Sequence, residues 1–152
     1  MFTPLIDIYK NDKRVGAVDK YVLIGEQAFA RCGLTTLFSP VLQCSTLSTG
    51  ITGIWSPVVI WYFNPFADKY THTKPSPVCE NILEPTAERA IIEYIIFKDY
   101  FDEFVLIEGL KTYMFNNPKD YYERLLEESK IWHLPQDLLD YWIKEAVEDE
   151  EV

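Results

Sequence analysis

The stretch EPTAERAIIEY at residues 84–94 divides the chain into two parts with different sequence patterns. Before it, short segments rich in β-branched and aromatic residues alternate with glycine and proline, which is typical of strands joined by turns. After it, apolar residues recur every three or four positions, as in amphipathic helices. This order predicts an α+β fold, with a small mixed or mainly antiparallel sheet in the first half and four helices in the second.

Helix-start signals place the four helices of the second half. Thr86 can cap the first helix with its hydroxyl, and Asp102 can cap the second. Asn117 followed by Pro118 predicts a cap and a first helical residue for the third helix, and Pro135 begins the fourth. The first helix carries apolar residues on a stripe wide enough to predict burial on two sides.

The first half contains a strand at residues 17–24 that runs into a short helix, which Gly33 should end. The remaining segments are predicted as two strands, an exposed loop and a return to the sheet, at residues 41–47, 58–63, 64–77 and 78–83. With 48% apolar and 15% aromatic residues, the 152 residues can bury a sizeable core. We expect a single domain made of an N-terminal extension, a sheet-rich part and a helical part, at residues 1–20, 21–83 and 86–148.

Charge is distributed unevenly along the chain, whose net charge is -10. Residues 1–79 carry 7 Lys and Arg against 5 Asp and Glu, giving +2, whereas residues 80–152 carry 7 against 19, giving -12. Such a surface repels phosphate backbones and favours a basic protein face, so we expect no binding to duplex DNA. The alternative is a solvated helical face that serves only solubility.

Segments that target or cross a membrane are not apparent. No apolar run approaches the roughly 18 to 20 residues that a spanning helix needs, and the first residues lack the pattern of a signal peptide. A cytoplasmic location is expected. The cysteines Cys32, Cys44 and Cys79 are odd in number and widely spaced, which predicts reduced, mostly buried thiols rather than disulfides or a zinc site.

A search for chemistry identifies no catalytic residue, no metal ligand and no cofactor. The chain has six glycines and lacks the glycine-rich motifs that hold phosphates. His72 and His133 stand apart from other ligand-type residues. We expect His72 to be an ordinary loop residue and His133 to have a packing role near a helix junction.

The candidate site is the polar cluster within residues 84–94, namely Thr86, Glu88, Arg89 and Glu93. In the structural interpretation, Thr86 and Glu88 stabilise a helix start. Arg89 and Glu93 can pair along the helix, and an Arg89 that is partly buried would hold a carboxylate or backbone carbonyls in a fixed fork.

The aromatic stretch at residues 55–66 contains Trp61 and Phe63, which are either core residues or anchors of a contact surface.

Two segments of the chain resemble the C-terminal domain of AbiEi-type antitoxins. YVLIGEQA at residues 21–28, followed by CGL at 32–34, is similar to the strand and helix that open that domain. Residues 84–94 resemble the family's Thr-Pro-Glu-Arg-Ala segment, with Ala87 in place of the commoner proline. The resemblance covers roughly residues 21–146.

That resemblance implies an antitoxin of an abortive-infection toxin–antitoxin system, in which the toxin is a nucleotidyltransferase. Members commonly carry an N-terminal winged helix, but only about 20 residues precede Tyr21, so we do not expect the DNA-binding function here. The expected function is an AbiEi-like antitoxin or phage-defence regulator that acts by protein contact, neutralises a nucleotidyltransferase-like toxin and has no DNA-binding domain of its own. A homo-oligomer is left open.

Two alternatives remain at this stage. One is a small enzyme whose polar centre is formed by Glu88, Arg89 and Glu93, and the other is a structural subunit of a larger assembly. A concave pocket lined by those three residues would favour the enzyme, whereas a flat acidic or aromatic face would favour a binding protein.

Overall fold

The computed structural model covers the whole chain and defines the backbone of most of it. It describes residues 6–10, 13–18, 21–36, 42–46, 51–52, 59–63, 71–77 and 82–149. Within these, side chains are described for residues 22–36, 43–44, 71–77 and 83–149.

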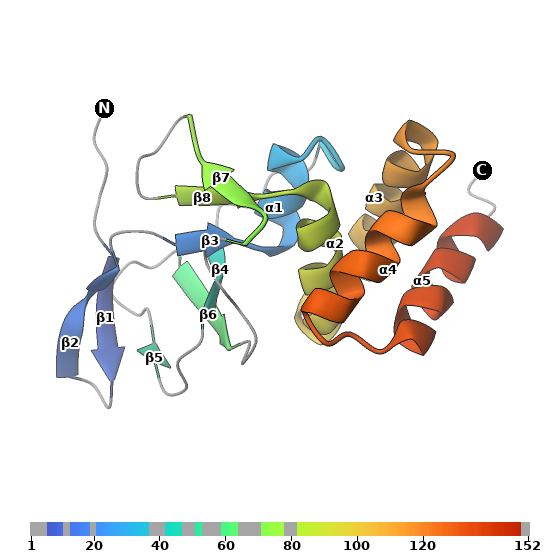
Figure 1. The fold of residues 1–152 in the computed structure, drawn as a ribbon. Coiled ribbons are helices and arrows are strands. Elements are labelled where there is room, and N and C mark those ends of the chain that lie inside the picture. Colours follow the sequence, from blue (N-terminus) through green and yellow to red (C-terminus); the bar gives the residue numbers. More distant parts are fainter. Residues whose placement is uncertain are drawn as a thin grey trace.

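Two sheets gather at one end of the molecule (Figure 1). The larger has five strands in the order β6-β4-β3-β8-β7, and these are Val59–Phe63, Leu42–Thr46, Tyr21–Leu23, Ile82–Pro85 and Thr73–Pro75. Its pairs β3/β8 and β4/β6 are parallel, whereas β3/β4 and β7/β8 are antiparallel. The smaller sheet is antiparallel, in the order β2-β1-β5, with strands Lys13–Val18, Ile6–Lys10 and Ile51–Thr52.

Helices form the other end of the molecule. Helix α1, Gly25–Arg31, follows β3 directly. The second half contains α2 to α5, at Ala87–Ile96, Glu103–Asn116, Tyr121–Ile131 and Gln136–Glu148, and a short 3₁₀ turn η1 at Lys98–Tyr100. The α+β fold is therefore confirmed, with a mixed sheet first and four α-helices in the second half.

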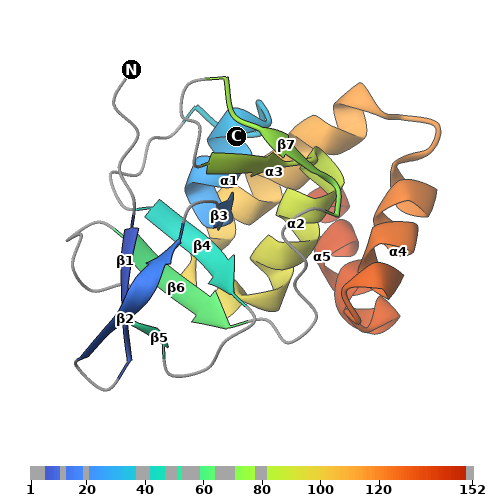
Figure 2. The ribbon, with the colours of Figure 1, turned by 60° about the vertical axis from the view of Figure 1, so that its left-hand side comes forward.

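Helix α2 is the central helix of this arrangement. It packs against α1, α3, α4 and strand β8, and Figure 2 shows it between the sheet and the outer helices. Its residues 89–95 are all buried, including Ile91, Ile92 and Ile95. The predicted burial of this helix on two sides is confirmed, because its apolar residues cover more than one stripe.

Local caps explain several helix ends. Thr86 and Asp102 cap α2 and α3 as predicted: the Thr86 hydroxyl accepts from the Arg89 N–H, and the Asp102 carboxylate from the Phe104 N–H. Gly33 follows α1 with φ +74°, and its N–H donates to the carbonyl of Ala30. A glycine is suited to this left-handed position because it has no Cβ. The predicted end of that helix is confirmed.

The third helix of the second half begins later than the sequence predicts. Asn117 ends α3: its N–H donates to the carbonyls of Tyr113 and Met114, and its side-chain amide also donates to Tyr113. These bonds hold Asn117 on the preceding helix, so the predicted cap at Asn117 and helix start at Pro118 are wrong. Helix α4 begins at Tyr121, after three turn residues.

Two segments of the first half also differ from expectation. The predicted loop at residues 64–77 contains strand β7, which pairs with β8 and places Lys74 opposite Glu84. Residues 1–20, expected to be an extension, include the hairpin of β1 and β2. In both cases the strand pairs with the next strand of the chain, and strand formation depends on such cross-strand contacts rather than on local composition alone.

Candidate functional site

The predicted polar cluster lies where the β7/β8 hairpin meets the start of α2. The Thr86 N–H donates to the carbonyl of His72 at 2.9 Å, which holds the turn before β7 against the helix start. His72 adopts φ +54°, a left-handed conformation that residues other than glycine seldom adopt. The hairpin therefore places Thr71 and His72 next to helix α2, which begins more than a dozen residues later in the sequence.

Arg89 is the centre of this cluster and is fully buried. Its Nε donates to Glu93 Oε1 at 2.7 Å, and its Nη1 donates to the carbonyl of Thr71 at 2.5 Å. Its guanidinium also lies 4.4 Å from the centre of the Trp132 ring, a cation–π distance. The structure thus confirms the predicted pairing of Arg89 with a carboxylate and a backbone carbonyl.

Glu93 is buried as completely as Arg89. Its Oε1 accepts from Arg89, while its Oε2 has no hydrogen-bond partner among the described residues. Cys44 lies in the same region, and burial together with the Glu93 charge raises the pKa of its thiol. A buried pair of this kind is costly to break, because the partner left behind keeps an uncompensated charge in a low-dielectric interior.

A second buried carboxylate extends the cluster to α4. The Trp132 Nε1–H donates to Glu128 Oε2 at 2.6 Å, and the His72 Nδ1–H donates to Glu128 Oε1 at 2.7 Å. The Glu128 side chain is 5% exposed, whereas that of His72 is 45% exposed. The cluster therefore links the β7 turn, α2 and α4 through charged and hydrogen-bonded side chains.

Glu88, the remaining polar residue of the predicted cluster, faces another side of α2. It accepts from the Tyr113 hydroxyl at 2.5 Å, and Arg124 Nη1 lies 3.9 Å from the same carboxylate. Burial, followed by the hydrogen bond to Glu88, raises the pKa of Tyr113. The three charged residues of the cluster are thus not arranged around one space.

A pocket of about 350 Å³ lies beside the start of α2, although Glu88, Arg89 and Glu93 do not line it. Its lining residues are Arg31, Cys32, His72, Thr73, Lys74, Glu84, Pro85, Thr86 and Ala87. The Arg31 Nε donates to Glu84 at 2.7 Å, and the Cys32 thiol donates to the carbonyl of Pro85 at 3.3 Å.

The Cys32 thiol lies on the wall of this pocket. Burial, and after it the charges of Glu84 and Glu88, raise its pKa to about 11, whereas Lys74 and Arg31 act in the opposite direction.

The other residues singled out in the sequence have different positions. Trp61 and Phe63 belong to strand β6, but their side chains lie outside the described residues, as does Cys79. Cys32 is half-buried and Cys44 is buried. His133 is exposed rather than packed: with φ +60° it follows the end of α4, and its N–H donates to the Lys130 carbonyl. Its predicted packing role is wrong, because the residue is exposed at the surface.

Sequence reasoning missed Trp132 and Glu128, and it took His72 for an ordinary loop residue. Glu128 lies in the polar segment EESK, a pattern that is typical of a solvent-exposed helix face. Trp132, four residues later, is the one local signal, because that spacing places both side chains on the same face.

The described part of the chain contains no group of three or more His, Cys, Asp or Glu side chains arranged to hold a metal ion. None of the described helices is long and apolar enough to cross a membrane.

The comparisons with known proteins do not assign the chain to a family: no family model matches it, and no curated protein matches it significantly.

Proposed function

We propose that this chain works by contact with another protein, as an AbiEi-like antitoxin or phage-defence regulator that neutralises a nucleotidyltransferase-like toxin. The observation that carries the protein-contact part is the exposure of large apolar side chains on the helical half, among them Phe104 and Phe115 of α3.

The burial of Arg89 and Glu93 against each other weighs against the enzyme alternative centred on Glu88, Arg89 and Glu93. A catalytic group must reach the substrate, and Arg89 and Glu93 have no solvent-exposed surface. Neither pocket described for the chain is lined by any of the three. In the proposed function, residues 84–94 hold the β7/β8 hairpin on the helical half.

The outer surface of the helical half has the composition of a contact surface. Residues 86–149 carry 7 Lys and Arg against 15 Asp and Glu, and of these Arg89, Glu93 and Glu128 are buried, so the surface is acidic. Large apolar side chains lie exposed among these charges, with Phe104 at 54% and Phe115 at 84% on α3, and Tyr141 at 50% on α5. Exposed aromatic side chains are frequent anchors of protein interfaces, and acidic groups around them select a basic partner.

Co-expression tests this proposal. The proposal predicts that a gene next to this chain's own encodes a nucleotidyltransferase-like protein, and this protein should arrest growth when it is expressed alone. Co-expression of the chain should restore growth, and the two proteins should copurify. Unrelieved arrest at equal expression, with no copurification, would show that the proposal is wrong.

Matched charge variants would map the contact face. Glu123→Gln with Glu127→Gln removes two exposed charges from α4, and Asp140→Asn with Glu148→Gln removes two from α5. We expect one pair to weaken capture severalfold and to reduce its salt dependence, since charges at an interface act mainly on association. Equal effects of both pairs would indicate general attraction rather than a defined face.

A further inference from the structure

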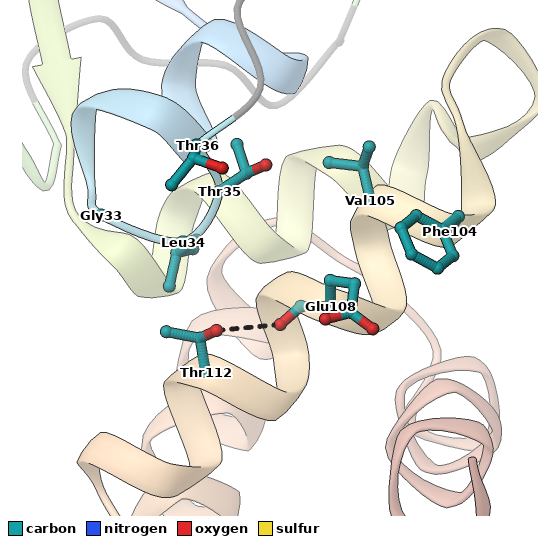
Figure 3. A pocket seen from close by; sticks show the side chains of 8 residues that line it. All are labelled: Gly33, Leu34, Thr35, Thr36, Phe104, Val105, Glu108 and Thr112. Atoms are coloured by element: carbon teal, nitrogen blue, oxygen red, sulfur yellow. Dashed lines mark hydrogen bonds between the residues drawn. The ribbon is translucent and has the colours of Figure 1, made fainter. Parts of the chain in front are cut away.

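A second pocket, of about 330 Å³, opens between the segment that follows α1 and helix α3. Figure 3 shows residues 33–36 on one side of it and α3 on the other. The lining side chains are aromatic, aliphatic, hydroxyl and carboxylate groups, from Gly33, Leu34, Thr35, Thr36, Phe104, Val105, Glu108 and Thr112. No lysine or arginine belongs to this lining.

The α3 wall of the pocket is a stripe with a spacing of four residues. Phe104, Glu108 and Thr112 follow one another at this spacing, which places them on one face of the helix. Gly109 allows the α1 side to come close, because a Cβ at this position would lie 2.5 Å from the Phe29 ring of α1. The close approach of α1 brings residues 33–36 beside the stripe.

The pocket combines a negative charge with an exposed aromatic ring. The Glu108 side chain is 34% exposed, and the Phe104 ring beside it is about half exposed. Lys111 Nζ lies 4.0 Å from Glu108 Oε1, beyond hydrogen-bond distance, and it donates to Asp149 at the end of α5. Glu108 Oε1 is buried, so a further donor would reach this carboxylate at its other oxygen, alongside its present contacts.

We infer that this pocket receives one arginine side chain from a basic protein partner. The planar guanidinium can donate to the Glu108 carboxylate while its face stacks on Phe104, and its outer N–H groups can reach threonine hydroxyls. A volume near the lower end of the roughly 300 to 1,000 Å³ range of ligand pockets suits a single side chain. The inference rests on the proposed function, because it names the chemistry by which the helical surface recognises its partner.

Charge complementarity favours an arginine side chain over other groups in this pocket. An anion would meet Glu108 in a protein whose helical half is already acidic. A purely apolar side chain would cover the carboxylate without giving it a donor. A lysine ammonium is a strongly hydrated point charge and gains less than a guanidinium from the Phe104 face.

Nuclear magnetic resonance with a small probe tests the inference on the full chain. The probe is N-acetyl-arginine methylamide, and N-acetyl-citrulline methylamide is its uncharged control of nearly the same shape. Titration with the arginine probe should give saturable amide shifts confined to residues 33–36 and 104–112, with millimolar affinity. The citrulline probe should bind at least about fivefold more weakly, because the charge-assisted hydrogen bond is lost.

Two variants separate the pocket from general electrostatics. Glu108→Gln should weaken the arginine response about fivefold or more, whereas Glu127→Gln, which removes an exposed charge from α4, should leave it unchanged. Phe104→Ala should also weaken it, because the stacking face is removed. Melting temperatures equal to that of the parent protein would show that each variant is folded.

The inference is overturned if arginine produces no saturable shifts at the pocket, if citrulline binds equally well, or if Glu108→Gln and Glu127→Gln behave alike. These outcomes are independent of the toxin co-expression test. Copurification of a partner without an arginine response would overturn the pocket inference and leave the proposed function standing. An arginine response that Glu108→Gln abolishes supports the inference, even where the co-expression test fails.

Discussion

Arg89 and Glu93, one turn apart on α2, form an ion pair at 2.7 Å in which neither side chain has any solvent exposure. Arg89 of this pair contacts Trp132, which caps the C-terminal end of α4, and the carbonyl of Thr71 from the turn before β7. It therefore connects three separate parts of the fold. The two charges are held by each other and by fixed dipoles in place of water, so the effect of removing one partner should be large.

Replacement of one member of this pair should be far more harmful than replacement of both. We expect Arg89→Ala to lower the free energy of unfolding by about 3 to 5 kcal/mol, because it leaves Glu93 buried and unpaired. The double variant Arg89→Met with Glu93→Leu should recover most of this loss. Urea denaturation measures both. Arg124→Ala, at an exposed pair with Asp120, is the matched control and should change the midpoint little. A harmless Arg89→Ala would mean that the cluster is only a helix start.

The two buried tryptophans of the helical half offer a test of the hydrogen bond to Glu128. Trp132 donates its Nε1–H to Glu128, whereas Trp142 Nε1 has no hydrogen-bond partner among the described residues. Replacement by phenylalanine removes the same indole group from each. Trp132→Phe should therefore cost about 1 to 2 kcal/mol more than Trp142→Phe in thermal or urea unfolding. Equal costs would mean that the hydrogen bond contributes nothing beyond ring packing.

Gly109 should tolerate no side chain while Phe29 remains in place. A Cβ at residue 109 would lie 2.5 Å from the Phe29 ring. Gly109→Ala should lower the free energy of unfolding by about 1 to 3 kcal/mol through overpacking, even after the gain in helix propensity. Phe29→Leu introduced into the same chain should restore part of this loss, as the smaller side chain makes room. Calorimetry of the single and double variants would contradict the explanation if no recovery occurred.

Cys32 should react slowly with alkylating reagents. Burial raises its pKa to about 11, so that at about pH 8 its thiolate fraction should be roughly 100-fold below that of an ordinary cysteine. Iodoacetamide labelling followed by mass spectrometry, in a Cys79→Ser background, measures the rate. Because the Glu88 charge raises this pKa, Glu88→Gln should speed the reaction; Lys74 lowers it, so Lys74→Ala should slow the reaction further. If Cys32 were labelled as fast as free cysteine, its pKa would not be raised and the prediction would be wrong.

Glu26 should lower stability at neutral pH, and Glu26→Gln should raise it. Burial, and secondly the charge of Asp102, raises the pKa of Glu26 in the folded chain. A raised carboxyl pKa means that folding favours the protonated form of Glu26. The stability that protonated Glu26 contributes is therefore present at low pH and is lost as the pH rises. The gain from Glu26→Gln should be greatest at neutral pH and vanish below the ordinary pKa near 4.5. Melting temperatures measured across this range would refute the explanation if the gain grew in acid.

The sequence alone determined the fold class and the local chemistry of the helices. Thr86 and Asp102 could be predicted as helix caps because a cap hydrogen bond joins residues no more than three positions apart. A short stretch of sequence therefore contains both partners. The pairing of Arg89 with Glu93 could also be predicted, since four residues of helix bring the two side chains together. Gly33 ended α1 for a similarly local reason.

Only the tertiary structure decided which residues complete the candidate site. Thr71 reaches Arg89 because β7 pairs with β8, and Trp132 and Glu128 reach the cluster because α4 packs on α2. The pocket at Glu108 likewise depends on the approach of α1 to Gly109. These contacts join residues distant in sequence, and their free energies depend on packing and desolvation in the folded chain. Local periodicity predicts which face of a helix or strand is apolar, but it does not predict which element packs against that face.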